Sequence, residues 1–208
     1  MKSKAIRRIY GGRTVLDVPE LIFEAGKVYA VMGANGSGKS TFARAVALEG
    51  EYEGSFIVGY MPQKNYAFRM SVKKNVLVSG ADEEKALRLM ERLGLSGLSD
   101  KNAKTLSGGE TAKLAIARTF GKRFDVLILD EPTAAMDVES TFEAERMIRE
   151  YCDVEKAAVI LITHSVKQAF RIADELLVFH EGRLAESGRA KDVIERPQSE
   201  AAKAVFMI

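Results

Sequence analysis

Apolar residues follow two different periods along this chain. Short runs of consecutive apolar residues are typical of strands that are buried on both faces. The strands predicted in this way are 27–32, 126–129, 157–162 and 175–180. Elsewhere apolar residues recur every three or four positions, which is typical of amphipathic helices. The helices predicted in this way are 40–48, 82–93, 110–120, 140–151 and 165–172. Strands that alternate with such helices predict an α/β fold with a mostly parallel sheet.

The composition is that of a globular protein. With 208 residues, of which 47% are hydrophobic and 29% charged, the chain can form one sizeable core, and we expect a single domain over 1–208. The net charge of +2 gives no strong basic field, so no nucleic-acid partner is expected. The single cysteine, Cys152, has no partner for an internal disulfide.

The chain shows no sign of a membrane span. No apolar run reaches the roughly 18 residues that cross a bilayer. Residues 1–10 are charged and lack the apolar centre of a secretory signal. If the protein works at a membrane, we therefore expect another polypeptide to supply the span.

A glycine-rich segment follows the first predicted strand and opens a helix, and it fits the pattern G-x-x-x-x-G-K-[ST]. Glycines let backbone N–H groups converge on phosphate oxygens, and the helix presents its N-terminus to the anion. Lysine places a charge at the β- and γ-phosphates, and the following hydroxyl can bind Mg²⁺. A plain glycine turn is the alternative. The candidate nucleotide-binding residues are Gly33, Ala34, Asn35, Gly36, Ser37, Gly38, Lys39, Ser40 and Thr41.

Three further candidates lie where predicted elements begin or end. Asp130 and Glu131 follow the strand 126–129, where Asp130 can hold the Mg²⁺ shell and Glu131 can deprotonate the attacking water, although paired acids at a strand end are often only solvated. His164 follows the strand 157–162 and could reach a γ-phosphate at the same sheet edge. His180 lacks such a context and is interpreted as structural.

A Ser-Gly-Gly-Glu segment, residues 107–110, precedes the helix 110–120. A hydroxyl, free amides and the helix dipole make such a start a good anion site. Plain N-capping by the serine, with the glycines as a loop, explains the same residues equally well. The sequence of this segment alone leaves both interpretations open.

Taken together, these motifs resemble those of the ABC ATPase family over nearly the whole chain. The segment 33–40 looks like Walker A, 126–131 like Walker B with its catalytic glutamate, and 106–110 like the family signature. The resemblance also assigns roles to single residues. Gln63 looks like the Q-loop glutamine that contacts Mg²⁺ and the attacking water, and Asp137 looks like the D-loop aspartate. His164 looks like the switch histidine, and Tyr10 looks like the aromatic that stacks on adenine.

The resemblance implies a P-loop NTPase (RecA-like) core with a small antiparallel β lobe and a helical lobe inserted at roughly 64–105. It also implies Mg²⁺-dependent ATP hydrolysis in a head-to-tail homodimer, with each ATP between Walker A of one subunit and the signature of the other. Ser107, Gly108, Gly109 and Glu110 would then bind the nucleotide in trans, while Ser40, Gln63 and Asp130 hold the metal.

The chain departs from the family pattern in three places. Glu110 stands where glutamine is commoner, and we expect it to add negative charge near the opposite subunit's nucleotide. The D-loop reads Ala-Ala-Met-Asp at 134–137 in place of the frequent Ser-Ala-Leu-Asp. Only 24 positions separate Lys39 from Gln63, so the β lobe must be abbreviated.

The ATPase subunit of a membrane transporter is the favoured interpretation. The alternatives are a soluble ABC ATPase, such as a cluster-assembly ATPase, and a phosphate-loop small-molecule kinase, which would not need the signature. A short separate ATPase chain is typical of importers, and segments 60–63 and 68–76 are similar to those of tungstate-type oxyanion importers. The expected partners are an integral membrane subunit and an extracytoplasmic substrate-binding protein, with this chain at the cytoplasmic face of the membrane.

A groove beside Gln63 is the expected contact with the membrane subunit. Apolar residues alternate along the segment that follows the glutamine, and basic residues flank them. An apolar strip with a basic rim suits an amphipathic helix. The core of the helical lobe is the alternative place for these side chains. The apolar residues are Tyr66, Phe68, Met70 and Val72, and the basic ones are Lys64, Arg69, Lys73 and Lys74.

Overall fold

An eight-stranded mixed sheet organises the chain, which a computed structural model describes over residues 1–206. The strand order is β2-β3-β10-β9-β4-β8-β7-β6, and a separate two-stranded ribbon pairs β1 with β5. Strands β9, β4, β8, β7 and β6 run parallel to one another, as the α/β pattern predicts. The strands are β1 (Lys2–Ser3), β2 (Ile6–Tyr10), β3 (Arg13–Val18), β4 (Val28–Met32), β5 (Tyr52–Glu53), β6 (Val58–Met61), β7 (Val126–Asp130), β8 (Ala158–Ile162), β9 (Glu175–His180) and β10 (Arg183–Arg189).

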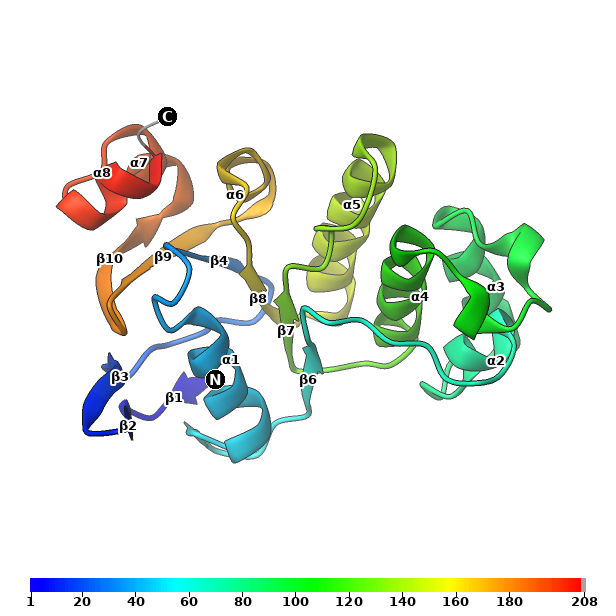
Figure 1. Ribbon diagram of the computed structural model, residues 1–208, viewed down its shortest axis with the longest axis horizontal. Helices are drawn as coiled ribbons and strands as arrows, with labels where there is room; N and C mark the ends of the chain where they lie inside the picture. The colour runs from blue at the N-terminus through cyan, green and yellow to red at the C-terminus, as the bar shows by residue number, and fades with distance from the viewer. Residues whose placement is uncertain (207–208) are drawn as a thin grey trace.

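Helices cover both faces of the parallel strands, with α1 and α5 on opposite sides (Figure 1). Side chains of β7 show this alternation, because Ile128 packs on the α1 side while Leu127 and Leu129 pack on the side of α4 and α5. Burial on both faces is why β4, β7 and β8 are uniformly apolar up to Asp130. The helices are α1 (Lys39–Glu49), α2 (Val72–Leu77), α3 (Glu83–Arg92), α4 (Gly108–Phe120), α5 (Val138–Glu155), α6 (Val166–Ile172), α7 (Ala190–Glu195) and α8 (Glu200–Phe206).

Helices α2 and α3 lie between β6 and α4 in the sequence and pack on α4 at one end of the molecule (Figure 1). Two short 3₁₀ turns, Ser96–Leu98 and Ala103–Thr105, complete this region. Its apolar side chains join those of α4 and α5 in one buried cluster. Among residues 1–206, no helix combines the length and apolar character needed to cross a bilayer.

The antiparallel strands extend the main sheet instead of standing apart from it. Strand β2 pairs with β3, and β10 joins both β3 and β9. Strands β1 and β5 have two residues each, so the insertion between α1 and β6 is short, as the spacing from Lys39 to Gln63 predicts.

Two helices begin earlier than their apolar periods predict. Helix α4 begins at Gly108 because Ser107 caps it, and α5 begins at Val138 because Asp137 caps it. Helix α5 also continues to Glu155, four residues past the predicted end at 151. Polar caps lie outside the apolar stripe, so the period alone does not locate them.

Candidate nucleotide-binding and hydrolysis site

The candidate site lies at the carboxyl edge of the parallel strands. Strand β4 leads into the glycine-rich loop, β7 ends at Asp130, and β8 leads to Thr163 and His164. Because β4, β8, β7 and β6 are adjacent and parallel, their carboxyl ends meet at one edge of the sheet. This edge is where open α/β sheets bind their ligands.

The loop from Gly33 to Gly38 needs its glycines. Gly33, Gly36 and Gly38 have φ values of 150°, 78° and 99°, a region that residues with a Cβ atom rarely adopt. A Cβ atom on Gly33 would lie 2.2 Å from the carbonyl oxygen of Phe179. The amide of Gly182 donates to the carbonyl of Ser37 at 3.0 Å and so ties the loop to the turn between β9 and β10.

Lys39 is held inside the loop that it follows. Its ammonium group donates to the carbonyl oxygens of Gly33 and Ala34, each at 2.9 Å, and the residue is only 6% exposed. Burial lowers the pKa of Lys39, while the carboxylates of Glu131 and Asp130 oppose that shift. The lysine charge therefore already lies inside the loop, where a triphosphate would be bound.

Asp130 is the carboxylate best placed for a metal. It is 2% exposed, and burial raises its pKa, with a smaller contribution from Glu131. The Ser40 and Tyr60 hydroxyls oppose the shift, Tyr60 at 3.4 Å from Oδ2. The other oxygen, Oδ1, is buried and has no hydrogen-bond partner in the described chain. A buried acceptor without a partner beside a serine hydroxyl fits a Mg²⁺ ligand pair.

Glu131 and His164 lie in contact at this edge and are the candidate reactive pair. Glu131 Oε1 lies 3.0 Å from His164 Nε2. The Glu131 amide donates to Ile162 in the neighbouring strand at 3.0 Å, and the residue has a φ of 50°. This left-handed conformation is uncommon for a residue other than glycine and places the side chain at the end of the strand.

The remaining predicted residues of this edge lie after β6, in the loop and at the start of α1. Gln63 is exposed, and it follows β6, whose Met61 lies in register with Leu129 of β7. Residues Ala34 and Asn35 are exposed at the loop tip. Thr41 lies half-buried in the first turn of α1.

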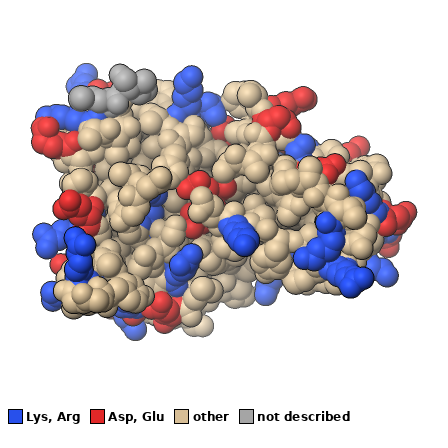
Figure 2. All heavy atoms as spheres, viewed as in Figure 1, with Lys and Arg blue, Asp and Glu red and all other residues tan. Residues whose placement is uncertain are grey.

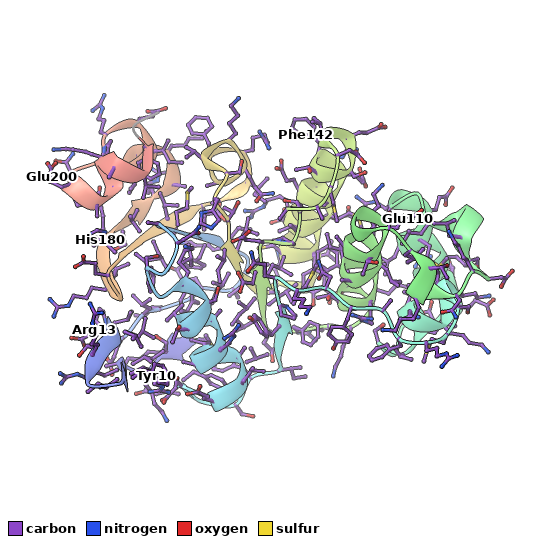
Figure 3. All side chains as sticks on the ribbon, in the orientation of Figure 1. Tyr10, Arg13, Glu110, Phe142, His180 and Glu200 are labelled. Carbon is purple, nitrogen blue, oxygen red and sulfur yellow. The ribbon has the colours of Figure 1, made fainter. Side chains whose placement is uncertain are left out.

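A hollow of about 860 Å³ adjoins the loop and contains the predicted adenine-stacking residue. Tyr10, 63% exposed, lines it together with Gly36, Arg13 and His180. Figure 3 shows Tyr10, Arg13 and His180 on the same side of the molecule. His180, which the sequence leaves without a functional context, is exposed and lines this hollow. Its place before the Glu181-Gly182 turn was the signal that it ends a strand at the surface.

The signature segment lies away from the phosphate loop of its own chain. Figure 3 shows Glu110 far from Tyr10 and His180, across the molecule. The segment forms a capping box, in which Ser107 Oγ accepts from the Glu110 amide at 3.2 Å and a Glu110 carboxylate oxygen accepts from the Ser107 amide at 2.7 Å. The capping interpretation therefore applies within the single chain, and the Ser107 bond lowers the pKa of Glu110. Gly108 and Gly109 occupy the first turn of α4.

Asp137 also acts as a helix cap. Its carboxylate accepts from the amide and the hydroxyl of Ser140 at 2.8 and 2.9 Å, and Lys113 lies 3.8 Å away. A Cβ atom on Gly109 would lie 3.0 Å from the carbonyl of Ala135, so the signature and the D-loop touch within one chain.

A groove of about 450 Å³ lies between Tyr60 of β6 and the helical region, although Gln63 itself is not among its lining residues. Phe68 and Met70 line it, but Val72 is fully buried in the helical core, so including Val72 in the strip was wrong. The alternation fails there because α2 begins at Val72. Arg118 stacks on the Tyr66 and Phe68 rings at 5.0 and 4.9 Å.

The fold and the site together define a phosphate-loop nucleoside triphosphatase. Comparison with known proteins gives the family: the ABC transporter family model matches residues 16–134. The tungstate uptake system ATP-binding protein TupC of Peptoclostridium acidaminophilum is 36% identical, over 88% of this chain and 95% of that protein. The phosphate import ATP-binding protein PstB of Campylobacter jejuni is 31% identical, over 98% of this chain and 96% of that protein.

Solved structures agree in fold. One titled as the ATP-binding subunit of an ABC transporter superposes with a TM-score of 0.83 at 20% identity, covering 99% of this chain and 97% of that chain. A bacterial Atm1-family ABC exporter with ATP bound gives the same TM-score at 22% identity, and the match covers 41% of that longer chain. The chain belongs to the ABC transporter family as an ATP-binding subunit that hydrolyses ATP and works with membrane partner subunits.

Proposed function

We propose that this chain hydrolyses ATP at the carboxyl edge of its sheet to drive import through a separate membrane subunit. The observation that carries the proposal is the convergence of the phosphate loop, Asp130 and the Glu131–His164 pair at the ends of adjacent parallel strands. The loop amides and Lys39 bind the phosphates, and Tyr10 stacks on adenine in the hollow beside Gly36.

Glu131 is the proposed base. Its carboxylate accepts a proton from the attacking water, and His164, 3.0 Å away, holds the carboxylate in place and can reach the γ-phosphate. The half-buried position of Glu131 limits its rotation. Gln63 orients the same water from the end of β6.

Mg²⁺ fits the residues of this edge. Asp130, Ser40 and Gln63 would hold it, with the buried Oδ1 of Asp130 as the acceptor that otherwise has no partner in the described chain. When bound, the ion neutralises charge on the β- and γ-phosphates. Within residues 1–206 no cluster of three His, Cys, Asp or Glu residues is placed to hold a metal ion.

A head-to-tail homodimer completes the site in this proposal. Ser107, Gly108, Gly109 and Glu110 lie away from the phosphate loop of their own chain, at a helix N-terminus suited to anions. Across the dimer they would face the nucleotide of the other subunit, with Asp137 beside them. One carboxylate oxygen of Glu110 accepts from the Ser107 amide, and this bond favours the charged form, so the expected negative charge stays on Glu110.

Import of an oxyanion is the proposed task. The relatives are named for uptake or import of tungstate, aliphatic sulfonates and phosphate, all of which carry anionic oxygens. The proposed arrangement is one nucleotide-binding domain over residues 1–208, with its helical lobe at 64–105, at the cytoplasmic face of the membrane. An extracytoplasmic binding protein would deliver the cargo. Figure 2 shows both acidic and basic side chains on this face of the molecule.

The groove lined by Phe68 and Met70 is the proposed contact with the membrane subunit. It opens beside the segment that carries Gln63, and Arg69 and Lys64 are exposed nearby. Tyr60 lines the groove and also reaches Asp130, so the groove and the metal site share one side chain. A short amphipathic helix from the membrane subunit suits this shape.

Replacing Glu131 by glutamine tests the proposal. The amide keeps the shape but cannot accept a proton, so Glu131→Gln should bind ATP and hydrolyse almost none, and with Mg-ATP it should elute as a dimer in gel filtration. Glu84→Gln, on the exposed surface of α3, is the matched control and should behave as wild type. Undiminished turnover in Glu131→Gln would remove Glu131 as the base, and failure to co-purify with a polytopic membrane protein would favour a soluble ABC ATPase.

A further inference from the structure

A buried polar cluster lies behind the reactive pair, between α5, α6 and the segment that follows Glu131. Gln168 and Glu145 are 1% and 3% exposed. The Gln168 amide Nε2 donates to Thr133 Oγ1 at 3.1 Å and to Glu145 Oε1 at 3.2 Å. Buried polar groups are costly unless they are hydrogen-bonded, so this amide is held in one orientation by two acceptors.

Glu145 is itself fixed from the other side. Arg171 donates to both of its carboxylate oxygens, at 2.7 and 2.6 Å. The guanidinium group lies over the Phe142 ring at 4.7 Å, and Phe142 lies at the molecular surface on α5 (Figure 3). A bidentate pair of this kind sets the direction of the carboxylate. Oε1 of Glu145 therefore faces Gln168 as a fixed acceptor.

Each end of this amide bridge belongs to one half of the reactive pair. Thr133 follows Glu131 in the turn that the Ala134 amide closes on the Glu131 carbonyl at 3.3 Å. Gln168 lies in the first turn of α6, the helix that follows His164. Its backbone N–H donates to the hydroxyl of the cap residue Ser165 at 3.2 Å. The bridge therefore joins the loop that follows Glu131 to the helix that follows His164.

We propose that Gln168 is a positioning residue that sets how Glu131 meets His164. The inference rests on the proposed roles of Glu131 and His164. Glu131 has a left-handed backbone, and such a conformation persists only where the surroundings hold it. The β7–β8 pairing fixes the backbone of Glu131, and the Gln168 bridge fixes the loop beyond it. Without the bridge, the turn at Thr133 can shift while the strands stay paired.

Gln168→Met tests this role because methionine keeps the length of the side chain and removes the amide. We expect the single-turnover hydrolysis rate to fall about 10- to 100-fold, as a small misplacement of reacting groups produces. The ATP Kd should stay at the wild-type value, because the phosphate loop is untouched. Lys167→Met introduces the same residue at an exposed position of α6 and should leave both quantities unchanged.

Two further variants separate positioning from stability. Glu145→Gln keeps an oxygen for the Gln168 amide but takes the charge from Arg171, so Tm should fall while the hydrolysis rate stays near wild type. Gln168→Leu also removes the amide and cannot donate, so it should lose rate as Gln168→Met does, and it replaces that variant if methionine prevents folding. A wild-type rate in folded Gln168→Met or Gln168→Leu overturns the inference. Parallel losses of rate, ATP affinity and Tm also overturn it. Glu131→Gln, tested separately, decides the proposed function itself.

Discussion

Asp130→Asn should make the nucleotide-free protein more stable while removing its response to Mg-ATP. Asp130 is 2% exposed, and its Oδ1 has no hydrogen-bond partner in the described chain. Leaving a buried acceptor unsatisfied costs about 1–3 kcal/mol, and more when the group is charged. The asparagine removes the charge but still buries polar atoms, so we expect a gain of about 1 kcal/mol, at the lower end of that range. For a chain of this length that gain raises Tm by about 2–4 °C.

Mg-ATP should reverse which of the two proteins, wild type or Asp130→Asn, has the higher Tm. At a hundredfold excess over Kd, a ligand stabilises the folded state by about 2.7 kcal/mol. Wild type should gain this with Mg-ATP, and Asp130→Asn should gain much less because a metal ligand is gone. With ATP and EDTA the two proteins should gain alike. Scanning calorimetry under these conditions measures every quantity, with Asp17→Asn, on the exposed side of β3, as the control.

The stability difference between Asp130→Asn and wild type should also depend on pH in a defined direction. Burial raises the pKa of Asp130 in the folded state, so the charged carboxylate destabilises the protein above that pKa. The extra stability of Asp130→Asn over wild type should be complete at neutral pH. It should shrink as the pH falls through the pKa of Asp130 in the folded state, and it should vanish below the pKa of Asp130 in the unfolded state. If Asp130→Asn instead melts lower without nucleotide at neutral pH, the carboxylate is satisfied in the fold and the reasoning is refuted.

Other substitutions probe the phosphate, base and docking contacts. Lys39→Ala should sharply weaken ATP binding or turnover because it removes the cation held in the loop, and wild-type values in nucleotide titration and phosphate release would exclude it from the site. Tyr10→Ala should raise the ATP Kd about tenfold per 1.4 kcal/mol, with roughly 1–3 kcal/mol expected for base stacking, and an unchanged Kd would place the base elsewhere. The double variant Phe68→Ala, Arg69→Glu should bind ATP normally but should fail to assemble with the membrane subunit or should uncouple hydrolysis from transport. Normal assembly and transport would show that the docking surface lies elsewhere. Loss of ATP binding would show that these residues have a structural role instead.

The sequence predicts the reactive edge well because parallel strands leave their carboxyl ends together. Once 27–32, 126–129 and 157–162 are read as buried parallel strands, Lys39, Asp130 and His164 must lie near one another. Local chemistry then assigns the phosphate loop, whose glycines have the backbone angles that only glycine adopts readily. No pairing information beyond the strand pattern is needed for this part.

Contacts between distant elements are what the pattern misses. Gln168 is a polar residue in a short amphipathic helix, and nothing local shows that its partners come from α5 and from the turn at Thr133. Val72 continues the alternation of Phe68 and Met70, yet it is buried because a helix begins there. The capping role of Ser107 depends on the position of the Glu110 side chain, which the sequence pattern does not give.

Two buried side-chain oxygens of the candidate site lack partners in the described chain, so a bound nucleotide can stabilise the fold there. Ser37 Oγ and Asp130 Oδ1 are buried without partners in the described chain, and Lys39 gives up water for two carbonyl oxygens. Each arrangement costs free energy when the site holds only protein. A triphosphate with its metal supplies a partner to each group, so binding relieves several costs at once. Tyr60 reaches from Asp130 to the groove beside Phe68, so one side chain contacts both the proposed metal site and the surface where we place the membrane subunit.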